Sequence, residues 1–355
     1  MARIAVIPGD GIGPEVTRQA MKVAAAAAAA SSFPLDLDWL DYSADTYLNT
    51  GVGLPQGAPE RLRNEYDAIF LGALGDPRIP DMAHAKEILL GLRFDLDLYV
   101  NHRPVKLLDA RLCPLRDRGP EDVDFVVFRE NTEGLYVGMG GIFKRGTADE
   151  VAIQEDVNTR KGVERIIRYA FEYARAHSLA RLHMSDKSNV LTFGHDLWQR
   201  VFVEVAEEYP EIEARHLYVD ALAMQLVKDP AQFEVIVTCN MFGDVITDIG
   251  AQLQGGLGMA GSANLNPETG AAMFEPVHGS APKYAGKNVA NPLAAVITTQ
   301  LMFDYLGQSE IATAVEAAIK AAIHDGEVTR DLGGTCTTEQ VGDKLAEPVS
   351  VAVTS

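Results

Sequence analysis

Short apolar runs alternate with longer amphipathic segments along this chain. The apolar runs with strand character are RIAVIPG near the start, YDAIFLGALG at 66–75, VDFVVF at 123–128 and EVIVTC at 234–239. The segments with apolar residues at helical spacing are 14–30, 83–100, 162–177, 240–253 and 291–307. Strands that alternate with helices predict an α/β fold.

Two stretches differ from this pattern. Ala24–Ala30 is a run of alanine, the residue with the highest helix propensity, and we expect it to end a surface helix. Residues 255–292 are rich in Gly, Pro and Asn, which indicates a long loop. Loops of that length in compact proteins usually carry function.

Length and charge narrow the class of protein. A chain of 355 residues is too long for one small core, so two domains or one large α/β unit are expected. No apolar run reaches the roughly 18 residues of a membrane span, and no charged-then-apolar leader is evident, so neither a membrane anchor nor a signal peptide is predicted. The formal net charge of −19 disfavours nucleic acid and anionic membrane as partners, because phosphate binding needs clustered cations.

The cysteines give a further expectation. Cys113, Cys239 and Cys336 have neither metal-ligand nor CxxC spacing. We expect them to be reduced, buried thiols of a cytoplasmic protein.

The first apolar run ends in a glycine-rich turn, GDGIGPE. Its glycines lie at 9, 11 and 13, and Pro14 occupies the place of the last glycine of the G-x-G-x-x-G fingerprint. No acidic residue ends a second strand in the usual register. Both observations disfavour a conventional Rossmann dinucleotide fold.

Two acids lie four residues apart in NMFGDVITDIG, directly after the apolar run at 234–239. If this segment is helical, Asp244 and Asp248 project from one face. Like charges at that spacing repel by roughly 0.2–0.5 kcal/mol. The pattern alone leaves open what offsets the repulsion.

Other polar residues are candidates for chemistry. Arg93, Arg103 and Arg129 each lie where an apolar segment meets a polar one, and guanidinium groups bind carboxylates through two parallel hydrogen bonds. Lys187 and Asp220 interrupt apolar contexts, where burial is costly without a partner. Taken singly, an arginine of this kind is more often ion-paired at the surface, and a structural salt bridge explains the lysine or the aspartate equally well.

Together these segments resemble the β-decarboxylating dehydrogenases that act on isopropylmalate, isocitrate, homoisocitrate, tartrate and D-malate. The resemblance covers essentially the whole chain. The matching segments, in the order of the family, are IPGDGIGPEV, LRFDLDLYVNHRP, RENTEGLY, DKSNVL, YVDALAMQL, NMFGDVITD and FEPVHGSAPKYAGKNVANP. Seven ordered matches are far more specific than a lone glycine motif.

The resemblance implies a role for each candidate. Arg93, Arg103 and Arg129 are similar to the arginines that bind the substrate carboxylates. Tyr136 and Lys187 resemble the catalytic tyrosine and lysine. Asp220, Asp244 and Asp248 resemble the ligands of Mg²⁺ or Mn²⁺, a cation that would convert the repulsion on the predicted helix into a binding site. In the family the lysine and the first aspartate come from the partner subunit, which implies a homodimer with shared active sites.

The resemblance also implies an architecture. We expect the two-domain isopropylmalate dehydrogenase-like α/β fold. The first domain would combine residues 1–102 and 255–355 and carry the coenzyme loops. The second, 103–254, would carry the metal ligands and the dimer contact.

The loop after EPVHG holds the adenosine end of the coenzyme in this family. Members that use NAD have Asp and an aliphatic residue after HGSAP, whereas Lys283 and Tyr284 here resemble NADP-dependent isocitrate dehydrogenases. A lysine and a tyrosine hydroxyl would bind a 2′-phosphate that an aspartate would repel, so NADP is predicted, with NAD possible. The implied coenzyme contacts are Glu275, His278, Gly279, Ser280, Ala281, Lys283, Tyr284, Asn291 and Arg330.

The resemblance implies that the substrate is a small anionic hydroxy acid, a malate with a group on C3. In the family, the helix before Arg93 contacts that group. NADP-dependent isocitrate enzymes carry Ser and Asn where this chain has Glu87 and Leu89, and homoisocitrate enzymes tend to carry Arg where it has Leu90. Leu89 and Leu90 would form an apolar pocket, as in isopropylmalate enzymes, and burying an isopropyl group is worth on the order of 2 kcal/mol. The predicted substrate is therefore 3-isopropylmalate, an assignment to leucine biosynthesis.

Other functions within the family stay open. D-malate and tartrate enzymes also carry a leucine pair, and the Lys283–Tyr284 pair favours NADP-dependent isocitrate dehydrogenase. A regulatory subunit without activity would be expected to have lost the lysine, the tyrosine or the metal aspartates, and none is lost.

Overall fold

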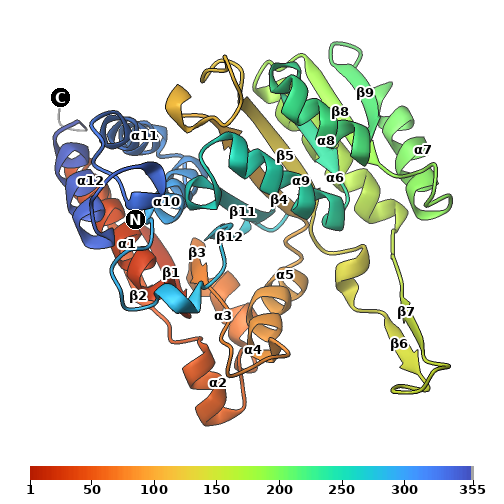
Figure 1. Ribbon diagram of the computed structural model, residues 1–355, viewed down its shortest axis with the longest axis horizontal. Helices are drawn as coiled ribbons and strands as arrows, with labels where there is room; N and C mark the ends of the chain where they lie inside the picture. Colours follow the sequence, from red (N-terminus) through yellow and green to blue (C-terminus); the bar gives the residue numbers. More distant parts are fainter. Residues whose placement is uncertain (353–355) are drawn as a thin grey trace. The chain divides into compact units, whose positions relative to one another are not determined.

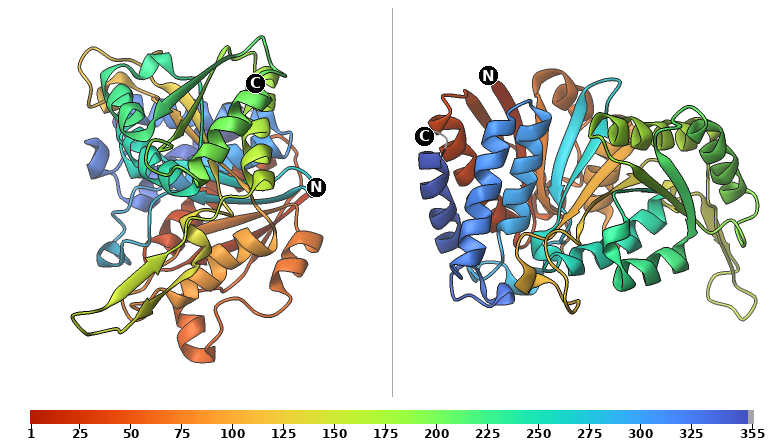
Figure 2. Two further views of the ribbon diagram at one scale, coloured as in Figure 1. Left: turned by 90° about the vertical axis from the view of Figure 1, so that its right-hand side faces the viewer. Right: turned by 90° about the horizontal axis from the view of Figure 1, so that it is seen from above.

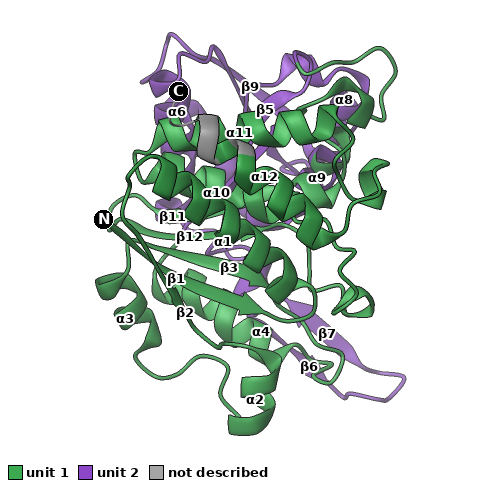
Figure 3. Cartoon of the chain, turned by 90° about the vertical axis from the view of Figure 1, so that its left-hand side faces the viewer, with its two compact units in different colours: residues 1–98, 107–120, 251–355 green, residues 99–106, 121–250 purple. Residues whose placement is uncertain are grey.

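The computed structural model describes residues 1–352 of the chain. They form two compact units, each made of discontinuous sequence (Figure 3). Unit 1 consists of residues 1–98, 107–120 and 251 onward, and unit 2 of residues 99–106 and 121–250. The expected division differs from this one mainly in residues 107–120, which were expected in the second domain and pack with unit 1.

Unit 1 is built on a sheet of mostly parallel strands, coloured red to orange and cyan in Figure 1. In spatial order the strands are β2 (Leu35–Trp39), β1 (Ala2–Gly9), β3 (Ala68–Ala73), β12 (Ala271–Pro276) and β11 (Gly261–Asn266). β12 runs parallel to β3 and antiparallel to β11. Ile4, Ala5, Val6 and Ile7 are all fully buried, as expected of a strand covered on both faces.

Helices cover both faces of this sheet. The helices of unit 1 are α1 (Gly13–Ala30), α2 (Ala44–Thr50), α3 (Ala58–Glu65), α4 (Ala83–Ala85), α5 (Gly91–Asp95), α10 (Leu293–Tyr305), α11 (Ser309–His324) and α12 (Thr338–Ala352). α1 packs against α10, α11 and α12 on one face (Figure 2). On the other face Leu62 of α3 and Leu92 of α5 join Ile7 and Leu71 in a buried cluster.

The alanine run belongs to an internal helix contact, which corrects the expectation of a surface helix. Ala24, Ala27 and Ala28 are buried, and α1 packs against α12. The approach is close, because a Cβ on Gly342 of α12 would lie 2.3 Å from Oε1 of Gln19 on α1. Small side chains on one stripe of α1 permit that approach.

The segment 83–100 is not one amphipathic helix, as was expected. α4 leads into a π-helical turn, η1 (Lys86–Leu90), and then into α5, which ends at Asp95. A strand begins at Val100, so the last residues of the predicted helix are extended. The expected loop at 255–292 is also corrected, since β11 and β12 pair within it and leave 277–292 as the loop proper.

The strands of unit 2 are also mostly parallel. In spatial order its strands are β4 (Val100–Lys106), β5 (Asp124–Glu130), β10 (Val235–Thr238), β8 (Arg181–Asp186) and β9 (Glu213–Tyr218). β4 is antiparallel to β5, and the later neighbours are parallel. α6 (Arg160–Ala176) and α7 (Gly194–Ala206) cover one face, while α8 (Val219–Lys228) and α9 (Asn240–Leu253) lie on the other (Figures 1 and 2).

A two-stranded hairpin extends from unit 2. Its strands, β6 (Gly140–Phe143) and β7 (Val151–Gln154), pair with each other and are exposed throughout (Figure 2). Their apolar side chains include Ile142, Phe143, Val151 and Ile153. An isolated hairpin of this kind is marginally stable in water.

The thiols differ in part from the expectation. All three cysteines are free, but only Cys239 is buried, and burial raises the pKa of its thiol to about 12. Cys113 and Cys336 are partly exposed. Within residues 1–352, no helix combines the length and apolar character needed to cross a membrane.

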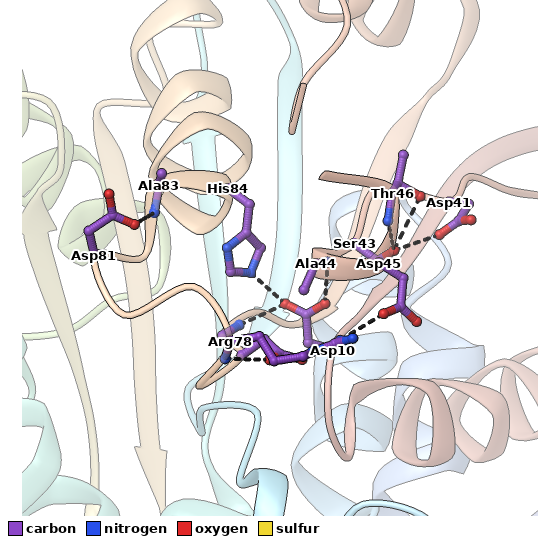
Figure 4. A network of polar contacts seen from close by, with 12 residues as sticks. Asp10, Asp41, Ser43, Ala44, Asp45, Thr46, Arg78, Asp81, Ala83 and His84 are labelled. Carbon is purple, nitrogen blue, oxygen red and sulfur yellow. Dashed lines mark hydrogen bonds and ion pairs between the residues drawn. The ribbon is translucent and has the colours of Figure 1, made fainter. Parts of the chain in front are cut away.

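Asp10 joins the loops at the carboxyl ends of β1, β2 and β3 (Figure 4). Its carboxylate accepts hydrogen bonds from the amides of Ala44 (2.6 Å) and Gly75 (2.8 Å) and lies 2.9 Å from Nε2 of His84. Asp10 is 6% exposed, so these groups depend on it rather than on water.

Replacing Asp10 tests this junction. Asp10→Ala would leave two buried amides and a buried imidazole nitrogen without their acceptor, and should lower the free energy of unfolding by about 3 kcal/mol. Asp67→Ala is the control, because Asp67 accepts a backbone amide at an exposed position, and the expected loss is below about 1 kcal/mol. Urea unfolding of both variants measures the difference, and equal losses would contradict the assignment.

Candidate active site

The register of the unit 2 sheet brings the candidate residues together. β5 and β10 run side by side, with Arg129 opposite Thr238, and α9 begins two residues later at Asn240. The first turns of α9 therefore lie beside the end of β5. Arg103 comes from the middle of β4, which pairs with β5 on its other side.

Two buried arginines converge on one carboxylate. Nη1 of Arg129 donates to Oδ1 of Asp244 at 2.6 Å, and Nη1 of Arg103 lies 3.3 Å from the same oxygen. Nη1 of Arg103 also donates to Oγ1 of Thr247 at 2.6 Å. The arginine side chains are 1% and 8% exposed, whereas that of Asp244 is 43% exposed. Asp244 thus lies at the open side of a positively charged group.

Tyr136 completes this group. Its hydroxyl donates to Oδ2 of Asp244 at 2.8 Å, and its ring lies 5.0 Å from Cζ of Arg129. Burial and the bond to Asp244 raise the pKa of Tyr136, and the two arginines oppose the shift. The phenol therefore keeps its proton at neutral pH.

The loop that carries Tyr136 is held by two carboxylate acceptors. The Glu130 carboxylate accepts the amides of Thr132 and Glu133 (3.0 and 2.7 Å), and burial raises the pKa of Glu130 to about 7. The Glu133 carboxylate in turn accepts the amide of Thr159 at the start of α6. These bonds fix the chain between β5 and Tyr136.

Asp248 lies one turn beyond Asp244 on α9. Burial, and next the negative charge of Asp244, raise the pKa of the Asp248 carboxyl. This is the like-charge pair expected from the sequence. Such a pair suits a hard divalent cation. The two carboxylates offer oxygen ligands, and a bound positive charge would offset their mutual repulsion.

Asp220 lies with Lys187, at the ends of the next strands. Lys187 directly follows β8, Asp220 opens α8 after β9, and Nζ of Lys187 is 2.5 Å from Oδ1 of Asp220. This bond lowers the pKa of Asp220. The amide of Lys187 donates to Nδ1 of buried His195 at 3.0 Å.

The three predicted metal ligands therefore divide into two groups within one chain. Asp244 and Asp248 both lie on α9. Asp220 lies on α8 and is paired with Lys187, which follows β8. Across residues 1–352, no three His, Cys, Asp or Glu side chains gather closely enough to hold a metal ion by themselves.

Arg93 lies in unit 1 and is 4% exposed. Its Nη2 donates to Oε1 of Glu275 at 2.7 Å, and Asn264 donates to the same oxygen at 2.9 Å. Glu275, expected at the coenzyme, is thus engaged with Arg93. On the π-turn, Leu89 packs against the unit 1 core and Leu90 is partly exposed.

A cavity of 1040 Å³ in unit 1 lies at the predicted coenzyme loop. Four of the implied coenzyme residues, His278, Tyr284, Asn291 and Arg330, line it. Nε2 of His278 is buried without a hydrogen-bond partner in the described part of the chain, an orphaned group that a bound ligand would satisfy.

The other coenzyme candidates of that loop, Gly279–Ala281 and Lys283, do not line the cavity. The Ser280 carbonyl accepts the amide of Ile12 at 2.8 Å, which closes Gly279–Ala281 over the β1–α1 turn. Gly11 has φ +60°, and a Cβ there would lie 2.0 Å from the Ser280 oxygen. Lys283 is exposed with Nζ 4.8 Å from the Tyr284 ring, while Lys287, which the sequence did not single out, lines the cavity.

Sequence reasoning missed residues that contact the candidate site residues. Asn240 contacts Arg129, Thr247 contacts Arg103, and His195 contacts the backbone of Lys187. The sheet register that pairs Arg129 with Thr238 could have indicated Asn240. No sequence signal distinguished Thr247 or His195.

The model of the family described as isocitrate/isopropylmalate dehydrogenase matches residues 3–345. The chain belongs to the isocitrate/isopropylmalate dehydrogenase family. A 3-isopropylmalate dehydrogenase of Thermobifida fusca is 45% identical over 349 residues, 98% of each chain. One of Corynebacterium kroppenstedtii is 45% identical over 346 residues, 97% of this chain and 98% of the relative. The crystal structure of isocitrate dehydrogenase from Methylococcus capsulatus has a TM-score of 0.89 and 36% identity, covering 99% of this chain and 100% of that one.

Membership in the isocitrate/isopropylmalate dehydrogenase family confirms the predicted fold and reaction class. The chain is an oxidoreductase of the β-decarboxylating dehydrogenase type, from a metal-dependent family that uses NAD(P) and acts on a small hydroxy acid. The group around Asp244 is the candidate for that chemistry.

Proposed function

We propose that this protein catalyses the NADP-dependent oxidative decarboxylation of 3-isopropylmalate. The observation that carries the proposal is the convergence of Arg103, Arg129 and Tyr136 on Asp244. It combines cations for an anionic substrate, a protonated phenol and a metal-type carboxylate. Relatives at 45% identity over nearly the whole chain are named 3-isopropylmalate dehydrogenase, which supports the substrate.

The proposed metal site uses Asp244 and Asp248 together with Asp220 of the partner subunit. Oxygen ligands favour Mg²⁺ or Mn²⁺. When bound, the metal supplies positive charge for the substrate oxygens, and the coenzyme supplies the hydride acceptor.

The side chains of the protein bind the substrate and move protons. Arg103 and Arg129 bind substrate carboxylates, and Arg93 is the third arginine proposed for this role. Lys187 accepts the proton of the substrate hydroxyl. Tyr136, whose pKa is raised, donates a proton to the carbon that loses carbon dioxide.

The substrate group on C3 is proposed to meet Leu89 and Leu90. Leu90, partly exposed on the π-turn, is the better placed of the two to meet a ligand, because Leu89 packs against the core. NADP-dependent isocitrate dehydrogenase is the second candidate, favoured by Lys283–Tyr284. Activity on D-malate or tartrate is a third.

A homodimer is proposed from the exposed apolar surface of unit 2. Phe143 and Ile153 of the hairpin are 66% and 55% exposed, and Met224 of α8 and Val245 of α9 are 65% and 53% exposed. Exposed apolar side chains that cluster on a surface element often mark a site of protein–protein contact. A partner subunit covering them would also supply the third metal ligand and the lysine.

Turnover of the proposed substrate is the direct test. With Mg²⁺ and NADP, the purified protein should reduce the coenzyme on addition of 3-isopropylmalate, measured as absorbance at about 340 nm, and EDTA should abolish the signal because carboxylate sites need the cation. Isocitrate, homoisocitrate, D-malate and tartrate, each with NAD and NADP, complete the panel. Preference for another of these acids would contradict the assignment of 3-isopropylmalate as the substrate. No activity with any of them would contradict the assignment as an enzyme.

A double substitution tests the coenzyme. Lys283→Asp with Tyr284→Ile should lower kcat/KM for NADP by about tenfold to a hundredfold, since it removes charge-assisted contacts and adds repulsion of the 2′-phosphate. The kcat/KM for NAD should stay the same or rise. Lys287→Ala is the comparison, because it removes a lysine that lines the cavity beside Tyr284. If the double variant keeps its preference for NADP, the two residues do not select the coenzyme.

Hybrid dimers test whether the sites are shared. Lys187→Ala and Tyr136→Phe should each be nearly inactive alone. After subunit exchange at equal amounts, about a quarter of wild-type activity should return, because half of the dimers are mixed and each mixed dimer contains one intact site. A site contained within one chain would recover nothing on mixing.

A further inference from the structure

Asn240 is a buried polar residue that no role has yet accounted for. It is 1% exposed and opens α9, two residues after Thr238. Because Thr238 pairs with Arg129 in the parallel register, the sheet places Asn240 beside the Arg129 side chain.

The carbonyl of Asn240 holds one edge of the Arg129 guanidinium group. Oδ1 accepts hydrogen bonds from Nε at 3.0 Å and from Nη2 at 2.7 Å. The other terminal nitrogen, Nη1, is directed to Asp244 at 2.6 Å. Two bonds to one oxygen fix the plane of the group, and with it the direction in which Nη1 points.

The aliphatic stem of Arg129 has little freedom either. A Cβ on Gly243 would lie 2.6 Å from both Cβ and Cγ of Arg129, so the stem rests on the backbone of the first turn of α9. Asn240 and Gly243 thus define the path of the side chain from both ends.

The amide nitrogen of Asn240 reaches a second element. Nδ2 donates to the Glu133 carbonyl oxygen at 3.1 Å, and a Cβ on Gly134 would lie 3.4 Å from Cβ of Asn240. Glu133 and Gly134 belong to the loop that carries Tyr136. One side chain therefore links the arginine and the tyrosine.

An amide suits this position better than other side chains. Aspartate would also accept from Arg129, but it would cancel the charge that a substrate carboxylate needs and would face the Glu133 oxygen without a donor. Alanine would leave buried N–H groups without an acceptor. A neutral group that accepts on one side and donates on the other keeps Arg129 both charged and oriented.

We propose that Asn240 is a positioning residue for the reaction, acting on the substrate through Arg129 and on proton donation through the loop of Tyr136. The inference rests on the proposed function, in which Arg129 binds a substrate carboxylate.

A double-mutant cycle with the full-length protein tests it. Asn240→Ala should raise KM for 3-isopropylmalate by about tenfold to a hundredfold and also lower kcat, while KM for NADP changes by less than about twofold. In the background of Arg129→Lys, adding Asn240→Ala should change KM for 3-isopropylmalate by less than about threefold, because the effect on substrate binding passes through a group already removed. It should still lower kcat, because the bond from Asn240 to the Tyr136 loop is lost in that background as well.

Two further variants separate positioning from general stability. Asn240→Asp has the same shape and keeps the acceptor for Arg129, so it remains measurable if the alanine variant does not fold, and it should also raise KM. Thr238→Val removes a neighbouring buried hydrogen bond, from Thr238 Oγ1 to the Ser185 carbonyl at 2.7 Å. It should lower the melting temperature and leave KM unchanged.

The outcomes are distinct. Unchanged KM in both Asn240 variants, independent effects of the two substitutions on KM in the cycle, or an equal rise of KM in Thr238→Val would each overturn the inference while wild-type turnover still supports the proposed function. If the wild type turns over none of the five acids, the proposed function fails and this inference fails with it.

Discussion

Unit 2 is organised around the balance of charge at Asp244. Two guanidinium groups withdrawn from water are costly unless they are paired, and one carboxylate at the open side of the group contacts both. In the proposed reaction these charged groups exchange the ions with which they pair. The arginines turn to the substrate carboxylates and Asp244 turns to the cation, so that positive and negative groups remain matched at each stage. The empty and loaded states can then both be stable without rebuilding the fold.

The parallel strands explain why these residues meet. Arg129 lies at the end of β5, Lys187 directly after β8, and Asp220 and Asn240 two residues after β9 and β10. Carboxyl ends of parallel strands share one edge, where open α/β sheets generally place their ligands. Each chain segment forms a strand of the sheet and carries one polar residue at or just after its carboxyl end.

Much of this could be predicted from the sequence, and the remainder depended on tertiary contacts. The strands and most helices follow from apolar runs and helical spacing, and the family motifs identified Arg129, Tyr136 and Asp244 before the structure showed them in contact. The burial of the alanine stripe on α1 was missed because it depends on α12, more than 300 residues later in the chain. The pairing of β11 with β12 was missed because Gly and Asn obscured the strand pattern. Asn240 was missed because its importance comes from the strand register and not from its neighbours in the sequence.

The π-turn before Arg93 has a consequence for how this family diversifies. A π-turn accommodates more residues than an α-helical turn, so side chains on its N-terminal side are rotated by about 100° relative to an uninterrupted helix for each residue added. Arg93, on its C-terminal side, keeps its bond to Glu275. A one-residue insertion here would thus bring a different set of side chains to face the ligand while the anchoring arginine stayed in place. Substrate choice could change in a single evolutionary step, and positions counted back from Arg93 would not be equivalent between members with and without the turn.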